Sequence, residues 1–201
     1  MYGGIFSIIE KLKVKNIIIG KQFEDSENYQ KLLRYSREKK IRIYNVCAGN
    51  KINIEKNLRF ECIWPETTNE IKENSINNNS LVIRLNYKNF NMLFVGDIEE
   101  KAEKQILQKY KDDLKILKST ILKIAHHGSK TSSTTEFLNA IKPEIVLIGV
   151  GEKNKFGHPS YEILDRLNNF TNEIYRTDKN GEISIITDGK NVKSMVEIEN
   201  K

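Results

Sequence analysis

The stretch ILKIAHHGSKTSS, residues 121–133, decides how the rest of the chain is interpreted. It begins as an apolar, β-branched run that is typical of a buried strand, and it ends in small polar residues that are typical of a loop before a helix. Two consecutive histidines and a glycine lie between these parts. Ligands of α/β proteins bind at the carboxyl ends of strands. The stretch therefore predicts a functional site at the edge of a sheet.

Two other segments follow the same pattern. The run LFVGD, residues 93–97, delivers Asp97 from the end of an apolar strand, beside a glycine that permits close approach. The run FGHP, residues 156–159, places His158 in a loop after another predicted strand. The three histidines of the chain all lie in these loops. Three strand ends thus each present a residue type that binds metal ions.

Hydrophobic spacing outward from these loops predicts alternating helices and strands. We expect Ser26 to cap one helix and the run Ser133 to Glu136 to form a capping box at the start of another. Residues 65–79 are expected to form a polar loop and residues 178–181 a turn. Helices are expected near residues 5–12, 26–39, 99–110, 133–141 and 160–168, and strands near 16–20, 41–46, 58–64, 80–87, 91–96, 120–125, 144–149, 173–177, 182–187 and 192–198. This order predicts an α/β sandwich with mixed sheets.

Length and composition indicate one domain, residues 1–201, because 201 residues with 38% hydrophobic content suffice for one buried core. The formal charge of +6 favours anionic partners such as DNA, but a general richness in Lys, Ile and Asn gives the same charge. Cys47 and Cys62 lack metal-binding spacing and are expected to be buried thiols. The N-terminus has neither a signal-peptide pattern nor a membrane span, so the chain as written is expected to be cytoplasmic.

Imidazole and carboxylate groups suit zinc, and a catalytic zinc site takes about three protein ligands and a water. Asp97, one histidine of the pair and His158 would provide three ligands. If the pair is extended, His126 and His127 point to opposite faces. One would then bind metal, while the other binds a substrate phosphate, donates a proton or orients the ligands.

Each residue also has a simpler interpretation. Asp97 could cap the helix that begins near Glu99, and the Gly-His-Pro run could be a surface turn. The loop at 129–133 could cradle a phosphodiester through hydroxyls, amides and a lysine, or it could only cap the next helix. A Ser129 nucleophile with His127 as base is disfavoured, because no G-x-S-x-G pattern is present.

The combination of GDIE at residues 96–99, HHGSKTSS at 126–133 and GHP at 157–159 resembles the metallo-β-lactamase-like domain of ComEC-type competence proteins. The run NNSLV at residues 78–82 also matches. The resemblance implies an αββα sandwich, one or two zinc ions, and a metal-activated water that cleaves nucleic-acid phosphodiesters during DNA uptake. It implies that Asp97, His126 and His127 are catalytic and that Asp97, His127 and His158 bind metal. It also implies that the substrate is bound by Ser129, Lys130, Ser132 and Asn79.

The chain departs from the family pattern at its start. The family's first metal motif, H-x-H-x-D-H, normally comes just before a Gly-Gly and a helix, and here the sequence MYGGI stands at that point. The first strands of the fold are therefore expected to be missing, which would expose a sheet edge and favour self-association. The alternative to a zinc-dependent nuclease is a catalytically inactive remnant or a non-catalytic partner module. Intact relatives are expected at a membrane or outside the cell.

Overall fold

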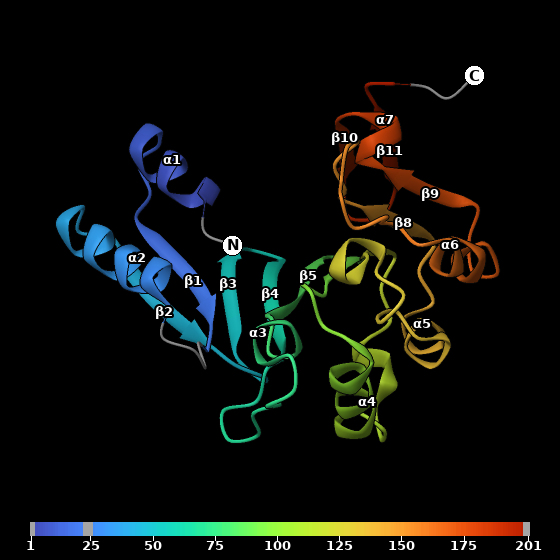
Figure 1. Ribbon diagram of the computed structural model, residues 1–201, viewed down its shortest axis with the longest axis horizontal. Coiled ribbons are helices and arrows are strands. Elements are labelled where there is room, and N and C mark those ends of the chain that lie inside the picture. The colour runs from blue at the N-terminus through green and yellow to red at the C-terminus, as the bar shows by residue number, and fades with distance from the viewer. Residues whose placement is uncertain (1–2, 22–25, 199–201) are drawn as a thin grey trace.

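The computed structural model describes residues 3–21 and 26–198, so Met1 and Tyr2 of the expected family junction lie outside the described residues. It shows a mixed α/β protein, as predicted, with one large sheet and two small ones (Figure 1). The helices are α1 Gly3–Lys11, α2 Glu27–Glu38, α3 Ser75–Asn78, α4 Glu100–Lys109, α5 Thr135–Ile141, α6 Tyr161–Asn168 and α7 Thr177–Asn180, with 3-10 turns η1 Leu114–Ile116 and η2 Ala125–Gly128. The strands are β1 Asn16–Gly20, β2 Arg42–Val46, β3 Lys51–Glu55, β4 Leu58–Trp64, β5 Val82–Tyr87, β6 Phe90–Phe94, β7 Ile121–Lys123, β8 Ile145–Ile148, β9 Glu173–Arg176, β10 Ile183–Thr187 and β11 Val192–Val196.

The large sheet has seven strands in the order β3-β4-β5-β6-β7-β8-β9. Strands β3 to β6 pair antiparallel, and β6 to β9 pair parallel. Parallel strands end at the same edge of a sheet, so the segments that follow β6, β7 and β8 meet there. These segments contain Asp97, the histidine pair and Gly149. The topology therefore brings together loops that are far apart in the sequence.

The main hydrophobic core holds this parallel half in place. Leu93, Leu122 and Val146 on neighbouring strands are at most 1% exposed. Helices α4 and α5 bury Ile106 and Leu138 completely in the same cluster. Full burial of such side chains is worth about 1.5–3 kcal/mol each. The parallel strands are thus the most firmly packed part of the described chain.

The N-terminal unit α1-β1-α2-β2 has a small core of its own. Its strands form a two-stranded parallel sheet, and its buried apolar residues are Ile9, Ile17, Leu32 and Ile41. Figure 1 shows this unit in blue at one end of the molecule, away from β8 to β11. Strands β10 and β11 form a second two-stranded sheet, which is antiparallel. Sheets of two strands are marginally stable by themselves.

The predicted order of helices and strands is confirmed except at three elements, and one of the two predicted helix caps is wrong. Strand β3 was missed, because its mostly exposed side chains give little hydrophobic signal. Short helices α3 and α7 lie where a loop and a turn were expected. Ser26 does cap α2, since its hydroxyl accepts a hydrogen bond from the Tyr29 amide. The capping box at Ser133 is wrong, because the hydroxyl of Thr134 caps α5.

Across the described ranges, no helix is long and apolar enough to cross a bilayer.

We predict that the amides of β1 and β2 exchange with solvent faster than those of β7 and β8. The small core of the N-terminal unit should let it open without unfolding the large sheet. Leu32→Ala, which removes a fully buried side chain and should cost about 2–5 kcal/mol, should speed exchange in β1 and β2 only. Hydrogen-deuterium exchange followed by mass spectrometry measures this difference. Equal protection of β1 and β7 in the unaltered chain would show that the two cores unfold together.

Candidate metal centre

The turn after β6 places Asp97 at the edge of the sheet. Gly96 has a φ of +56°, and a Cβ atom there would lie 2.7 Å from the Cβ of Ser80. Glycine is therefore required for this tight turn. The Gly96 carbonyl accepts a hydrogen bond from the His126 amide at 3.1 Å, which ties the turn to the histidine loop. Asp97 does not cap α4, because the N-cap residue is Glu99.

His127 is held in an orientation suited to a metal ligand. Its Nδ1 lies 2.6 Å from the carbonyl oxygen of Gly149, just after β8. A carbonyl only accepts, so Nδ1 carries the proton, and in the neutral ring Nε2 then presents a lone pair. Nε2 lies 3.8 Å from Asp97 Oδ1, and both side chains are 40% exposed. Histidines that bind metals characteristically donate their other ring N–H in this way.

The backbone of the histidine pair is not extended. The condition under which the two side chains were expected to point to opposite faces is therefore not met. His126 and His127 have φ values of 46° and 56°, both in the left-handed region. Each such residue costs on the order of 1–3 kcal/mol and needs support from its surroundings. The two rings nevertheless diverge: His127 faces Asp97, and His126 Nδ1 lies 3.5 Å from Glu99 Oε1. The two residues thus have different neighbours, although their backbone is not extended.

His158 belongs to the surroundings of His126. The centroids of the two rings are 5.8 Å apart in an edge-on contact. The Nδ1 atoms of both rings are buried and have no hydrogen-bond partner among the described residues. Burial lowers the pKa of His158, and His126 and His127 lower it further. These two Nδ1 atoms are therefore enclosed by protein, and only the remaining parts of the rings can contact a ligand.

Asp97 and His127 fit two positions of a zinc shell, because carboxylate and neutral imidazole are its usual nitrogen and oxygen ligands. Within residues 3–21 and 26–198, no group of three or more His, Cys, Asp or Glu side chains is close enough to hold a metal ion. His158 contacts the ring of His126 and lies near His127, but it does not complete a three-ligand group with Asp97 and His127. Its assignment as a metal ligand therefore stays a prediction.

Lys123 is a site residue that the sequence analysis missed. It is the last residue of β7, and its ammonium group donates a hydrogen bond to the Ile124 carbonyl at 3.0 Å. Burial lowers the pKa of Lys123, and the nearby Asp97 carboxylate opposes this shift. In the sequence, Lys123 could have been recognised because it is the one charged residue within the apolar run of residues 121–125. A half-buried lysine thus lies near the candidate metal ligand Asp97.

The four residues predicted to bind substrate differ in their exposure and in their hydrogen bonds. Lys130 is exposed at the site edge. The Ser129 hydroxyl pairs with the Thr131 hydroxyl at 3.0 Å. Ser132 is 1% exposed and donates to the Ile98 carbonyl at 2.7 Å. The Asn79 amide bonds to the Ile71 backbone and to the Ser75 carbonyl. Ser132 and Asn79 therefore hold loops together in this structure.

A buried carboxylate and a guanidinium group fix the loop after the histidine pair. Glu103 of α4 is fully buried and accepts hydrogen bonds from the Ser133 and Thr134 amides. Burial raises the pKa of Glu103, whereas these amides and Arg166 act in the opposite direction. Arg166 of α6 donates to the Ser132 and Ser133 carbonyls at 3.2 and 2.7 Å. The sequence did not indicate Glu103 as a buried residue, although it lies on the same face of α4 as the buried residues Ala102 and Ile106.

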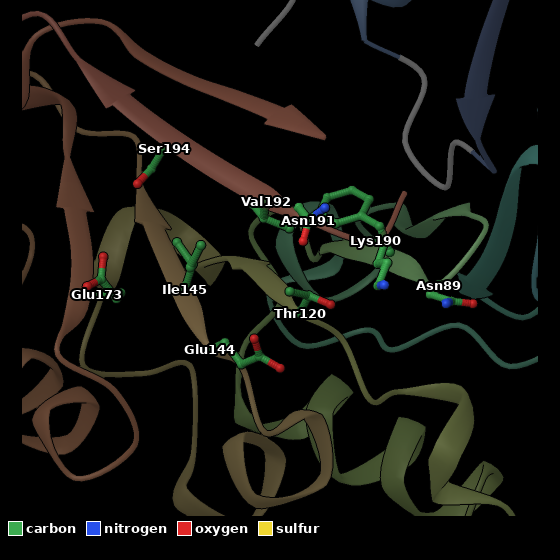
Figure 2. A pocket seen from close by; sticks show the side chains of 10 residues that line it. Asn89, Thr120, Glu144, Ile145, Glu173, Lys190, Asn191, Val192 and Ser194 are labelled. Carbon is green, nitrogen blue, oxygen red and sulfur yellow. The ribbon is translucent and has the colours of Figure 1, made fainter. Parts of the chain in front are cut away.

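Two open hollows of similar size lie near opposite ends of the parallel strands. One of about 620 Å³ adjoins the site and is lined in part by Asn78, Glu99, Lys130 and Thr131. The other, of about 610 Å³, includes Thr120, Glu144 and Glu173 just before or at the start of parallel strands. Figure 2 shows these polar groups spread around an open space. The second hollow is therefore remote from the histidines.

Comparison with known proteins links the chain to competence proteins. Over 176 residues, 88% of the chain, it is 30% identical to ComE operon protein 3 of Bacillus subtilis. It is 33% identical over 61% of its length to competence protein ComA of Neisseria gonorrhoeae. It is 28% identical over 64% of its length to recombination protein 2 of Haemophilus influenzae. The aligned segments span only 22%, 17% and 15% of these relatives. No protein-family model matches the chain.

We predict that Gly128→Ala destabilises the protein by about 2–4 kcal/mol, the sum of a left-handed backbone penalty and overpacking. Gly128 has a φ of +84°, and a Cβ atom there would lie 2.6 Å from the Cβ of Pro159. Gly151→Ala is the matched control, because a Cβ at that position meets nothing within 4 Å. Denaturant unfolding measures both changes. Equal stability of the two variants would contradict the close packing of these loops.

Proposed function

Because the chain is homologous to a segment of the ComEC-type competence proteins, we propose that it is a metal-dependent phosphodiesterase acting on nucleic acid during DNA uptake. We also propose that its mixed sheet and helices form part of a metallo-β-lactamase-like αββα sandwich. The observation that carries the proposal is the Gly149 carbonyl at His127 Nδ1, which leaves Nε2 facing Asp97. This arrangement lies at the carboxyl ends of parallel strands, where such sites are expected.

In this proposal Asp97 and His127 hold a zinc ion. A bound zinc ion lowers the pKa of a coordinated water and polarises a phosphoryl oxygen. The two side chains are each 40% exposed, so positions remain for water and for substrate. The Gly149 carbonyl fixes the His127 ring without occupying a ligand position. The conformation of the loop after β8 therefore sets the direction of the Nε2 lone pair.

The other polar groups have separate roles in the proposal. The Lys123 ammonium lies where it offsets negative charge near Asp97, and it attracts a phosphodiester to the site. His126 and His158, whose rings contact each other edge-on, accept or donate a proton at the leaving oxygen. Lys130, which is exposed, binds the neighbouring phosphate at the rim, whereas substrate binding by the buried Ser129 stays a prediction. In this assignment, each of the three histidines has one role.

A second candidate function is a non-catalytic module that completes its fold with another polypeptide segment. One observation favours it: a catalytic zinc takes about three protein ligands, and no such group is assembled within the described chain. In addition, β3 stands at the edge of the large sheet, and β1 and β2 form a sheet of only two strands. Such edges pair readily with additional strands. This candidate predicts weak metal binding by the chain alone.

We predict that the purified chain binds zinc and that Asp97→Asn and His127→Ala each reduce the bound zinc at least tenfold. Each substitution removes one of the two proposed ligands, and Asp97→Asn keeps the side-chain shape. Asp112→Asn is the matched control, because Asp112 is an exposed aspartate remote from the loops of the site. Elemental analysis after dialysis gives the zinc content, and hydrolysis of bis(p-nitrophenyl) phosphate gives the activity.

The same measurements separate the two candidate functions. Zinc near one equivalent, with hydrolysis that a chelator abolishes and added zinc restores, supports the phosphodiesterase. Weak zinc binding without hydrolysis supports the non-catalytic module. Zinc content that is unchanged in both Asp97→Asn and His127→Ala would show that the metal, if any, binds elsewhere.

A further inference from the structure

The loop between β8 and α6 displays an aromatic ring that the proposed chemistry does not use. Phe156 is 81% exposed, although it lies two residues from His158. Resting on the proposed function, we propose that Phe156 is a stacking platform for one unpaired base of a single-stranded nucleic acid. Phe156 is thereby a substrate-binding residue, and the preferred substrate is single-stranded rather than duplex.

The ring of Phe156 continues a row of rings that starts inside the site. Its centroid lies 5.9 Å from that of His158, and the two planes differ by only 18°. The ring of His158 in turn contacts His126 edge-on at 5.8 Å. One face of Phe156 is thus turned to His158, while its high exposure leaves the opposite face open. A flat nucleobase fits against that open face, within reach of the histidines.

The loop is built to hold this ring in place. The Asn154 side-chain oxygen accepts hydrogen bonds from the amides of Phe156 and His158 at 3.3 and 2.9 Å. Its side-chain nitrogen donates to the carbonyls of Gly151 and His158 at 3.1 and 2.8 Å. One asparagine therefore braces both ends of the segment that carries Phe156. An exposed ring on a braced loop loses little conformational entropy when a ligand stacks on it.

The charges around Phe156 suit a polyanion. Lys153 and Lys155 precede it on the same loop, and both are exposed. Lys130, on the histidine loop, interacts with Glu162 at the start of α6. The two loops are joined by a hydrogen bond of 2.9 Å from the Ser160 amide to the Gly128 carbonyl. Lysines beside an exposed aromatic ring are the usual elements of a single-strand binding surface.

Base stacking on a side chain also determines which nucleic acid is bound. The faces of a base inside a duplex are covered by its neighbours, so an external ring can reach only an unpaired or displaced base. Lysine contacts to phosphates, by contrast, exist for both forms. Phe156 therefore adds affinity for single strands, while Lys130, Lys153 and Lys155 add affinity for either form.

The test measures binding of the full chain to a fluorescent 20-nucleotide single strand and to a blunt-ended two-strand duplex of the same sequence, with a chelator present to stop hydrolysis. Phe156→Ala should weaken single-strand binding about tenfold, which is the effect of losing one stacked base, and should leave duplex binding unchanged. Phe156→Trp should retain the affinity. Tyr44→Ala, which removes another exposed aromatic ring, is the matched control and should bind like the unaltered chain.

A second readout isolates the stack itself. Single strands with one abasic position, moved along the sequence, should bind the unaltered chain more weakly at one register and should show no such dependence with Phe156→Ala. Unchanged affinity of Phe156→Ala, an equal loss on duplex, or no single-strand binding by the unaltered chain would each overturn the proposal. Because a chelator is present, failure of phosphodiester hydrolysis leaves this result intact and counts only against the proposed catalytic function.

Discussion

The structure depends on the parallel alignment of β6, β7, β8 and β9. Only this alignment places the residues after three successive strands at one edge of the sheet. Asp97 follows β6, the histidine pair follows β7, and the Gly149 carbonyl follows β8. The fully buried residues of these strands keep their ends in register. The site is thus a property of the sheet topology, and no single loop could assemble it.

The histidine loop requires support because its backbone is strained. Two adjacent residues in the left-handed region are unfavourable without compensating contacts. Glu103 and Arg166 provide such contacts from opposite sides, one to amides and one to carbonyls of the segment that follows. Leaving such a carboxylate buried without these donors would be costly. The strain in the loop and the contacts of Glu103 and Arg166 are therefore best understood as parts of one arrangement.

The sequence predicted the type and order of most elements, since their hydrophobic periodicity is strong. It also indicated Asp97 and the histidine loops, because ligand-type residues after apolar strands are distinctive. It did not indicate the left-handed turn at His126 and His127, which depends on contacts with Gly96 and Gly149. Glu103 was missed for a related reason. A carboxylate on a helix is usually solvated, and only the tertiary contact with another loop explains its burial.

The loop between β8 and α6 links the proposed metal site and the proposed stacking surface in one segment. Its first residue, Gly149, orients His127 through a backbone carbonyl, and its later residues display Phe156 and His158. Asn154 braces the part that carries both rings. A displacement of this loop would therefore alter the stacking surface and the direction of the His127 lone pair together. Since both effects have one origin, the binding of a base at Phe156 is expected to favour the His127 orientation that the proposed metal site needs.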